Sequence, residues 1–149
     1  MYANILLSTD GSEVAKKGVK QGLALAKVLN AKVTIITVTE PMSAYLGSGH
    51  AGWIPPQEMF ESFDTVRKEH VSEILDKARA LADQIGISAE LLHVPNTHPA
   101  TAIVETAKSR GCDLIVMGSH GRRGLKKLLL GSQTSEVLVN ASVPVLVVP

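Results

Sequence analysis

The sequence predicts a three-layer α/β fold, in which helices cover both faces of a five-stranded parallel sheet. Five short runs rich in Val, Ile and Leu are separated by segments with the 3.6-residue period of helices. Most of these runs are almost continuously apolar, which is typical of strands covered on both faces. Repeated alternation of strand and helix implies parallel strands joined by right-handed crossovers. Five strands are too few for an eight-stranded barrel, so we expect an open sheet.

The expected strands occupy five separate stretches of the chain. Aromatic side chains are scarce (two Phe, two Tyr and one Trp), so the core has to be built from Val, Ile, Leu and Ala. The strands are expected at Asn4–Thr9, Lys32–Val38, Ser88–Val94, Asp113–Met117 and Val145–Val148.

Helix-capping residues mark the ends of the first two expected helices. The first helix begins after Ser12, a good N-cap, and ends at Asn30, which tolerates the left-handed conformation. The second and longest helix follows Pro55-Pro56 and ends at Gly86. Its apolar stripe is expected to comprise Phe63, Val66, Ile74, Ala78, Leu81 and Ile85.

Two shorter helices are expected in the second half of the chain. One opens near Thr97–Pro99, because proline suits the first helical turn, and stops at Gly111. The other begins at Ser132, again as a capping residue, and ends near Asn140. The remaining irregular stretch, Glu40–Pro56, is rich in Gly, Ser and Pro. A loop of this length inside a compact domain is either functional or mobile, or else an insertion without a role.

Length and composition predict one domain over residues 1–149. The chain has 149 residues and a formal net charge of +1, which argues against a nucleic-acid binder. The single Cys112 cannot form an internal disulfide, so the fold does not depend on an oxidising compartment. The N-terminus does not resemble a signal peptide, and no apolar run approaches the ~20 residues of a membrane helix. We therefore expect a cytoplasmic protein that does not bind membranes.

The strongest functional motif follows the fourth expected strand. Gly118-x-x-Gly121 is separated by nine residues from Gly131-Ser132, which opens the last helix. Glycines allow a ligand to approach main-chain amides, and the start of a helix favours anions. Both ends of the segment therefore suit phosphate, with the Ser132 hydroxyl either capping the helix or binding a phosphate oxygen. Taken singly, each glycine can equally be a turn residue; the combined pattern is much less frequent by chance.

Positive charge is concentrated in the same segment. Arg122, Arg123, Lys126 and Lys127 place four cations within six residues of a chain that is nearly neutral overall. Cations beside a glycine-rich loop favour phosphate binding, although a solvated basic turn gives the same pattern.

Two further features fall at the carboxyl edge of the expected sheet, where open α/β sheets bind ligands. Ser8-Thr9-Asp10 ends the first strand, and the Asp10 carboxylate is suited to ribose hydroxyls, an adenine amino group or water-bound Mg²⁺. Asp-Gly is also a common turn in which Asp10 bonds its own backbone, and both interpretations stay open. Val38, at the end of the second strand, can form an apolar wall for a base or simply belong to the core.

Several familiar sites are missing from the sequence. There is no Gly-x-Gly-x-x-Gly after the first strand and no Gly-x-x-x-x-Gly-Lys-Ser/Thr. The five histidines lack the spacing of a zinc site, and Gly-x-Ser-x-Gly is absent. No nucleophile stands next to a base, so no catalytic residue or metal ligand is assigned.

Taken together, these residues resemble the universal stress protein family. Its nucleotide-binding branch carries Gly-x-x-Gly, nine residues and Gly-Ser/Thr at this place, and Gly118, Gly121, Gly131 and Ser132 match all of it. The resemblance extends from Ile5-Leu-Leu-x-x-Asp-Gly-Ser to the C-terminal Val-Pro-Val-Leu-Val-Val. It implies a Rossmann-like sandwich of the adenine nucleotide alpha hydrolase type, with strand order 3-2-1-4-5, that binds ATP, AMP or ADP, with or without Mg²⁺.

The resemblance also implies a role for particular residues. Asp10 would face the adenosine moiety, Val38 would border the base, and the loop Gly118–Gly124 would run along ribose and phosphates. Ser8 and Gln133 depart from the family, because many members have a small or apolar residue there. The nucleotide-binding residues predicted in this way are Ser8, Thr9, Asp10, Val38, Met117, Gly118, Ser119, His120, Gly121, Arg122, Arg123, Gly124, Gly131, Ser132, Gln133 and Thr134.

A homodimer follows from the same resemblance. With the implied strand order, Val145–Val148 lies at the edge of the sheet and is strongly apolar, which is an aggregation hazard unless it is covered. Antiparallel pairing with a second copy would cover it, and Pro144 and Pro149 would limit the extent of pairing.

Three functional hypotheses remain open. The first is an ATP-binding sensor or signalling module of the stress response, whose surface depends on nucleotide occupancy. The second is a slow Mg-dependent ATP hydrolase or phosphotransferase, with Asp10 holding Mg²⁺ and Arg122 or Arg123 stabilising charge on the phosphates. The third is a dimeric interaction scaffold that binds no nucleotide.

Overall fold

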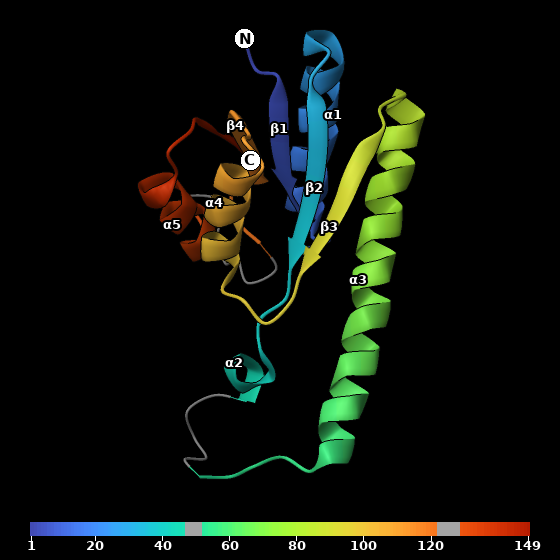
Figure 1. Ribbon diagram of the computed structural model, residues 1–149, viewed down its shortest axis with the longest axis vertical. Helices are drawn as coiled ribbons and strands as arrows, with labels where there is room; N and C mark the ends of the chain where they lie inside the picture. The colour runs from blue at the N-terminus through green and yellow to red at the C-terminus, as the bar shows by residue number, and fades with distance from the viewer. Residues whose placement is uncertain (47–51, 122–128) are drawn as a thin grey trace.

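The computed structural model describes residues 1–46, 52–121 and 129–149. Within these residues, five parallel strands form one sheet in the order β3-β2-β1-β4-β5 (Figure 1). The open parallel sheet predicted from the sequence is confirmed, and so is the strand order implied by the resemblance. The strands are β1 (Asn4–Ser8), β2 (Lys32–Val38), β3 (Ala89–Val94), β4 (Leu114–Gly118) and β5 (Val145–Val148).

Helices on both faces of the sheet complete the three layers. On one face lie α1 (Glu13–Leu29) and α3 (Gln57–Ile85), and on the other lie α4 (Pro99–Ser109) and α5 (Ser132–Asn140) (Figure 1). Each of α1, α4 and α5 follows the carboxyl end of a strand (β1, β3 and β4), so all three helices begin at the same edge of the parallel sheet.

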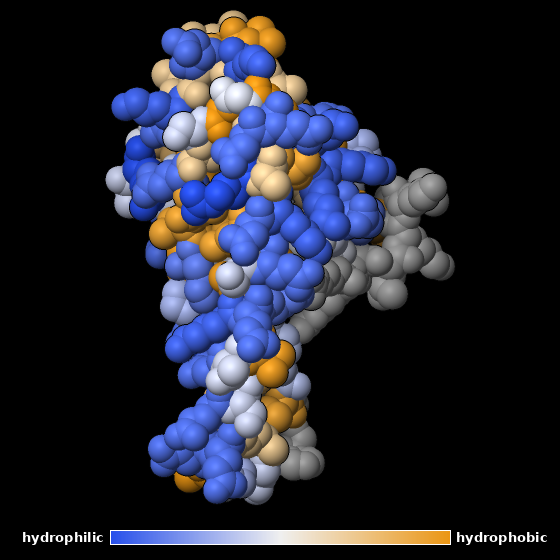
Figure 2. Space-filling view, turned by 90° about the vertical axis from the view of Figure 1, so that its right-hand side faces the viewer, coloured by the Kyte–Doolittle hydropathy of each residue, from blue (hydrophilic) through white to orange (hydrophobic). Residues whose placement is uncertain are grey.

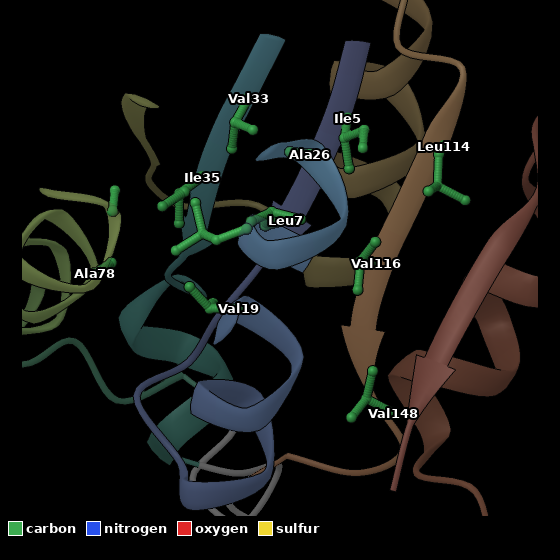
Figure 3. Close-up of a cluster of buried hydrophobic side chains, with 12 residues drawn as sticks. Ile5, Leu7, Val19, Ala26, Val33, Ile35, Ala78, Leu114, Val116 and Val148 are labelled. Atoms are coloured by element: carbon green, nitrogen blue, oxygen red, sulfur yellow. The ribbon is translucent and has the colours of Figure 1, made fainter. Parts of the chain in front are cut away.

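An aliphatic core lies on each face. Successive strand residues point to opposite faces, so Ile5 and Leu7 join the core under α1 and α3, whereas Leu6 joins the core under α4 and α5. Figure 3 shows the first core, in which side chains of β1, β2 and β4 meet Val19 of α1 and Ala78 of α3. These strand side chains are fully buried, and each contributes about 2 kcal/mol by leaving water.

The predicted ends of α1 and α3 are confirmed. The Ser12 hydroxyl accepts a hydrogen bond from the backbone N–H of Ala15 at 3.2 Å, which satisfies one of the free donors of the first turn. Asn30 and Gly86 close their helices with positive φ angles of 54° and 83°. The local signals in these two helices therefore agree with the tertiary fold.

The prediction that Ser132 caps α5 was wrong. Gly131 is the N-cap residue, with extended backbone angles, and its carbonyl accepts a hydrogen bond from Ser135 N–H at 3.0 Å. Ser132 is consequently the first residue inside the helix. Gly131 takes the capping position because its own N–H is already held by the Ser119 carbonyl at 2.8 Å, which fixes the chain before the helix starts.

The region between β2 and α3 also differs from the prediction. The stretch Glu40–Pro56, expected to be irregular, contains the short helix α2 (Met42–Leu46). Val66, expected on the apolar stripe of α3, is 65% exposed. The reason is length: the 29 residues of α3 span about 44 Å, whereas the seven residues of β2 span about 23 Å. The N-terminal part of α3 therefore projects past the sheet, where no strand lies beneath it (Figure 1).

Candidate ligand pocket at the carboxyl edge of the sheet

A pocket of about 330 Å³ lies at the carboxyl ends of β1, β2 and β4. The strand order reverses between β1 and β4, which is the position where open α/β sheets bind ligands. Its described lining residues come from seven elements and their connections, and they are Ser8, Thr9, Asp10, Ala15, Val38, Glu40, Tyr45, Pro99, Ile103, Met117, Gly118, His120, Gly121, Gly131, Ser132, Gln133 and Thr134.

One half of the pocket is apolar. Val38 at the end of β2, Pro99 and Ile103 of α4 and Tyr45 of α2 line this half. Val38 packs against the core under α4 and α5 and is only partly buried, so part of its side chain is left for a ligand. This half is suited to a flat, weakly polar group rather than to a charged one.

The other half is made of backbone. A Cβ atom on Gly118 would lie 2.9 Å from Val14 Cγ1 and 3.2 Å from the Ala15 nitrogen, so this glycine is required where β4 meets the start of α1. A Cβ atom on Gly131 would lie 3.0 Å from His120 Cα. The two ends of the glycine-rich segment are therefore in contact, and they form one wall of the pocket.

Asp10 joins the turn after β1 to this wall. Its Oδ1 atom accepts a hydrogen bond from Ser12 N–H at 2.9 Å, as expected for the turn interpretation. A Cβ atom on Gly121 would lie 2.5 Å from Asp10 Oδ2, so the carboxylate rests against the bare backbone of the second glycine. The turn role is therefore real, and the carboxylate lines the pocket as well.

The first turn of α5 forms the end of the glycine-rich half. The buried Thr134 hydroxyl donates to the Gly118 carbonyl at 2.9 Å, and Gln133 Oε1 accepts from Ala100 N–H at 2.9 Å. Both side chains thus hold the scaffold together, fixing α5 to β4 and to α4. What this turn offers to a ligand is its backbone N–H groups, which have no partner inside a helix.

Three ionisable side chains lie close together beside the pocket. His98, the N-cap residue of α4, has Nε2 2.5 Å from Glu136 Oε2 of α5 and Nδ1 3.9 Å from Glu40 Oε1 after β2. Within residues 1–46, 52–121 and 129–149, no group of three or more His, Cys, Asp or Glu side chains is arranged to hold a metal ion.

The structure brings most of the predicted site residues together. Ser119 is the exception among the described ones: its N–H donates to the Val148 carbonyl at 2.8 Å and its hydroxyl lies 3.1 Å from His120 Nδ1, so it joins β4 to β5 instead of lining the pocket. Arg122, Arg123 and Gly124 lie outside the described residues, as do Lys126 and Lys127.

Sequence reasoning missed five lining residues, which are Ala15, Glu40, Tyr45, Pro99 and Ile103. Pro99 and Ala15 had a local signal, because each lies in the first turn of a helix that begins at the carboxyl edge. Tyr45 had none, since its place depends on how α2 packs.

The fold and the pocket define a class of protein, an open α/β sandwich with its ligand site at the reversal of strand order. Within that class, the chain belongs to the Universal stress protein family, whose sequence pattern it matches over residues 1–149. It is 35% identical over 148 residues to Universal stress protein MJ0531 of Methanocaldococcus jannaschii, covering 99% of this chain and 82% of that protein.

Solved structures agree with this assignment. The structure of protein MJ0577 from the same archaeon superimposes with a TM-score of 0.83 at 28% identity, over 99% of this chain and 96% of that one. A universal stress protein in complex with cAMP gives a TM-score of 0.68 at 26% identity, over 99% and 97% of the two chains. In the part of the chain that the structure describes, no helix is both long and apolar enough to cross a membrane.

Proposed function

We propose that the protein binds an adenine nucleotide, ATP, AMP or ADP, and serves as a nucleotide-dependent sensor in the stress response. One observation carries the proposal: a single pocket joins an apolar half over β2 to a half of glycine backbone and helix N-terminus over β4 and α5. Such a pair of surfaces matches a molecule with a flat base at one end and phosphate at the other. The relative solved with cAMP supports an adenine ligand.

The order of the strands sets the direction of the ligand in this proposal. The base lies against Val38 at the end of β2, the ribose lies over Asp10 after β1, and the phosphates reach Gly121 and Ser132 beyond β4. The carboxyl ends of these three strands follow one another along one edge of the sheet in the neighbouring order β2-β1-β4, which supports this direction. A second carboxylate, Glu40, lies on the base side, so the phosphate end of the described pocket carries less negative charge.

The test is direct binding of AMP and ATP by titration calorimetry, together with mass spectrometry of small molecules released from the purified native protein. In Gly121→Val the new side chain meets the Asp10 carboxylate, so we expect AMP binding to weaken roughly 5- to 150-fold, as overpacking of about 1–3 kcal/mol implies. Ala24→Val, an exposed change on α1, is the control and should bind as wild type.

Equal binding by Gly121→Val and wild type would contradict the proposed site. Absence of any bound or released nucleotide would favour the scaffold hypothesis. Steady formation of ADP from Mg-ATP that is lost in Asp10→Ala would favour the hydrolase hypothesis, in which Mg²⁺ is a required cofactor.

We further propose that residues 1–149 act as one cytoplasmic domain that forms a homodimer through β5. This strand is one of the two edges of the sheet, and Leu146 on it is 38% exposed. Unpaired edge strands with apolar side chains favour pairing with a second copy. The lone Cys112 is buried and free, which suits a reducing compartment.

Leu146→Asp should shift the protein from dimer to monomer in light scattering, because a charge on the exposed side of the edge opposes pairing. Val28→Asp, at an exposed position of α1, is the matched control and should leave the mass unchanged. A wild-type mass of one chain, or a dimer that survives Leu146→Asp, would contradict pairing through β5.

A further inference from the structure

The aromatic residues of this chain are concentrated outside its core. Four of the five lie between residues 45 and 63: Tyr45, Trp53, Phe60 and Phe63. Among the described residues, the buried members of the two cores include no aromatic side chain, and Tyr2 packs against one core from its margin. Tyr45 lies in α2, Trp53 precedes α3, and Phe60 and Phe63 lie in the part of α3 that projects past the sheet (Figure 1). In Figure 2, hydrophobic residues reach the surface near the lower end of the molecule, where this segment lies.

Two of these aromatics form a tilted pair, and one member of the pair lines the pocket. Tyr45 of α2 is the one Phe, Tyr or Trp side chain that lines the pocket among the described residues. Its ring lies 5.5 Å from that of Phe63 on α3, with an angle of 59° between the planes. Tilted pairs at this separation are favourable, and two rings in contact restrict each other's rotation. Tyr45 is therefore held from behind by the overhanging helix.

Arg67 links this pair of rings to Glu40, which lines the pocket. Its guanidinium lies 5.2 Å from the centre of the Phe63 ring, within the range of a cation–π contact. The same group donates to the Glu40 carbonyl at 3.2 Å and to Asn96 Oδ1 at 3.0 Å, and it pairs with Asp64 at 2.8 Å. The Arg67 side chain is only 14% exposed and its bond to the Glu40 carbonyl is partly buried, whereas its bonds to Asn96 and Asp64 lie at the surface.

Next to Glu40, hydrogen bonds join Thr39, the residue after β2, to the end of β3. Thr39 N–H donates to the Val94 carbonyl at 3.0 Å, and Thr39 Oγ1 lies 2.8 Å from His93 Nε2. Burial of the ring, and then the positive charge of Arg67, lower the pKa of His93, so the imidazole is neutral at pH 7. A neutral His93 places no second positive charge beside the Arg67 guanidinium.

We infer that Tyr45 covers the base of the bound nucleotide and that Phe63 and Arg67 are positioning residues that hold Tyr45 in place. This inference rests on the proposed function. It explains why α3 is longer than the strands beside it, because its overhang carries the support for one wall of the pocket. An aromatic ring stacks on the face of a base and makes no contact with phosphate, so Tyr45 acts on the base end alone.

The test compares AMP with ribose 5-phosphate, which lacks the base. Tyr45→Ala should weaken AMP binding about tenfold, the effect of losing one stacked aromatic, and leave ribose 5-phosphate binding unchanged. Tyr45→Phe keeps the ring and should bind AMP as wild type. Phe60→Ala, a change of the same kind on the same overhang but outside the pocket, is the matched control and should have no effect.

The positioning role of Phe63 is tested by a double-mutant cycle. Phe63→Ala should weaken AMP binding by several-fold, and adding it to Tyr45→Ala should cause no further loss, because Phe63 acts through Tyr45. Phe63→Tyr keeps a ring against Tyr45 and should restore AMP binding.

The outcomes separate the two proposals. If the wild type binds neither AMP nor ATP, the proposed function fails and this inference fails with it. If the wild type binds AMP and Tyr45→Ala binds it equally well, the inference alone is overturned. It is also overturned if Tyr45→Ala weakens AMP and ribose 5-phosphate by the same factor, or if the losses of Tyr45→Ala and Phe63→Ala simply add.

Discussion

The backbone groups of helix ends are satisfied differently at the two ends of the sheet. At the amino end, helices α1, α3 and α4 finish, and side chains add to the caps of two of them: Asn4 Nδ2 donates to the Arg110 carbonyl at 2.9 Å, and Lys27 Nζ donates to the Ile85 carbonyl at 2.6 Å. The Asp113 carboxylate accepts the N–H groups of Ala3 and Asn4 at 2.8 and 3.1 Å. Backbone groups at this end are thus satisfied within the protein.

At the carboxyl end, helices begin and a pocket separates them. The starts of α1, α4 and α5 all face it, and a parallel sheet necessarily gathers these positive helix ends on one side. Side-chain bonds here join elements to one another, as Thr134 does to Gly118, but they leave open space in the middle. The comparison teaches that one end of the same scaffold stabilises the fold, whereas the other is available for a ligand.

Thr134→Val should have the larger effect and should damage both stability and binding. Valine has nearly the shape of threonine but cannot donate to the Gly118 carbonyl, which then stays buried without this partner. Such a loss costs about 2 kcal/mol, and it frees the start of α5 from the end of β4. Thermal unfolding and AMP titration measure the two effects.

Thr101→Val, at an exposed position of α4, is the control for the same change of side chain. If Thr134→Val unfolds at the wild-type temperature, the hydrogen bond contributes nothing to the fold. If Thr134→Val is destabilised but binds AMP normally, this contact at the carboxyl end serves the fold alone. The proposed difference between the two ends of the sheet would then be wrong.

The half of the pocket that is local in sequence could be predicted from the sequence. Gly118 ends β4, Gly121 follows three residues later, and Gly131 directly precedes α5, so their chemistry follows from spacing alone. The ends of α1 were predictable for the same reason, because Ser12 and Asn30 act on their own helix. The role of Ser132 was misjudged because glycine also caps helices well, and here a bond to Ser119 decided between two adjacent candidates.

The other half depends on contacts that no short pattern contains. Arg67 reaches the carbonyl of Glu40, 27 residues earlier, and Phe63 meets Tyr45 across the β2–α3 connection. The apolar period of α3 predicted a buried stripe, but periodicity does not reveal where the sheet beneath a helix ends. Val66 is exposed for that reason, while Ile74 and Ala78 on the same helix are buried as expected.

A smaller and selective effect is expected at the amino end from Asp113→Asn. Partial burial acts to raise the pKa of this carboxyl, but the N–H groups of Ala3 and Asn4 outweigh it, so the pKa is lowered below the ordinary 3.8. An asparagine keeps one acceptor and turns an NH₂ group towards the other donor. We expect a loss of about 1 kcal/mol at pH 7, or a thermal midpoint lower by about 3 °C, with AMP binding unchanged.

The pH dependence of this effect has a definite sign. A carboxyl whose pKa is depressed by folding contributes stability above its unfolded value of about 3.9, and this stability is lost as the pH falls through the folded value. The difference in thermal midpoint between wild type and Asp113→Asn should therefore be constant near neutrality and shrink in acid, below the ordinary pKa. Asp76→Asn, at an exposed position of α3, is the control for the same change of side chain and should leave the thermal midpoint unchanged at pH 7. A gap between wild type and Asp113→Asn that persists unchanged into strong acid would mean that the charge of Asp113 is irrelevant. A loss of AMP binding in Asp113→Asn would mean that the amino end is not confined to stabilising the fold.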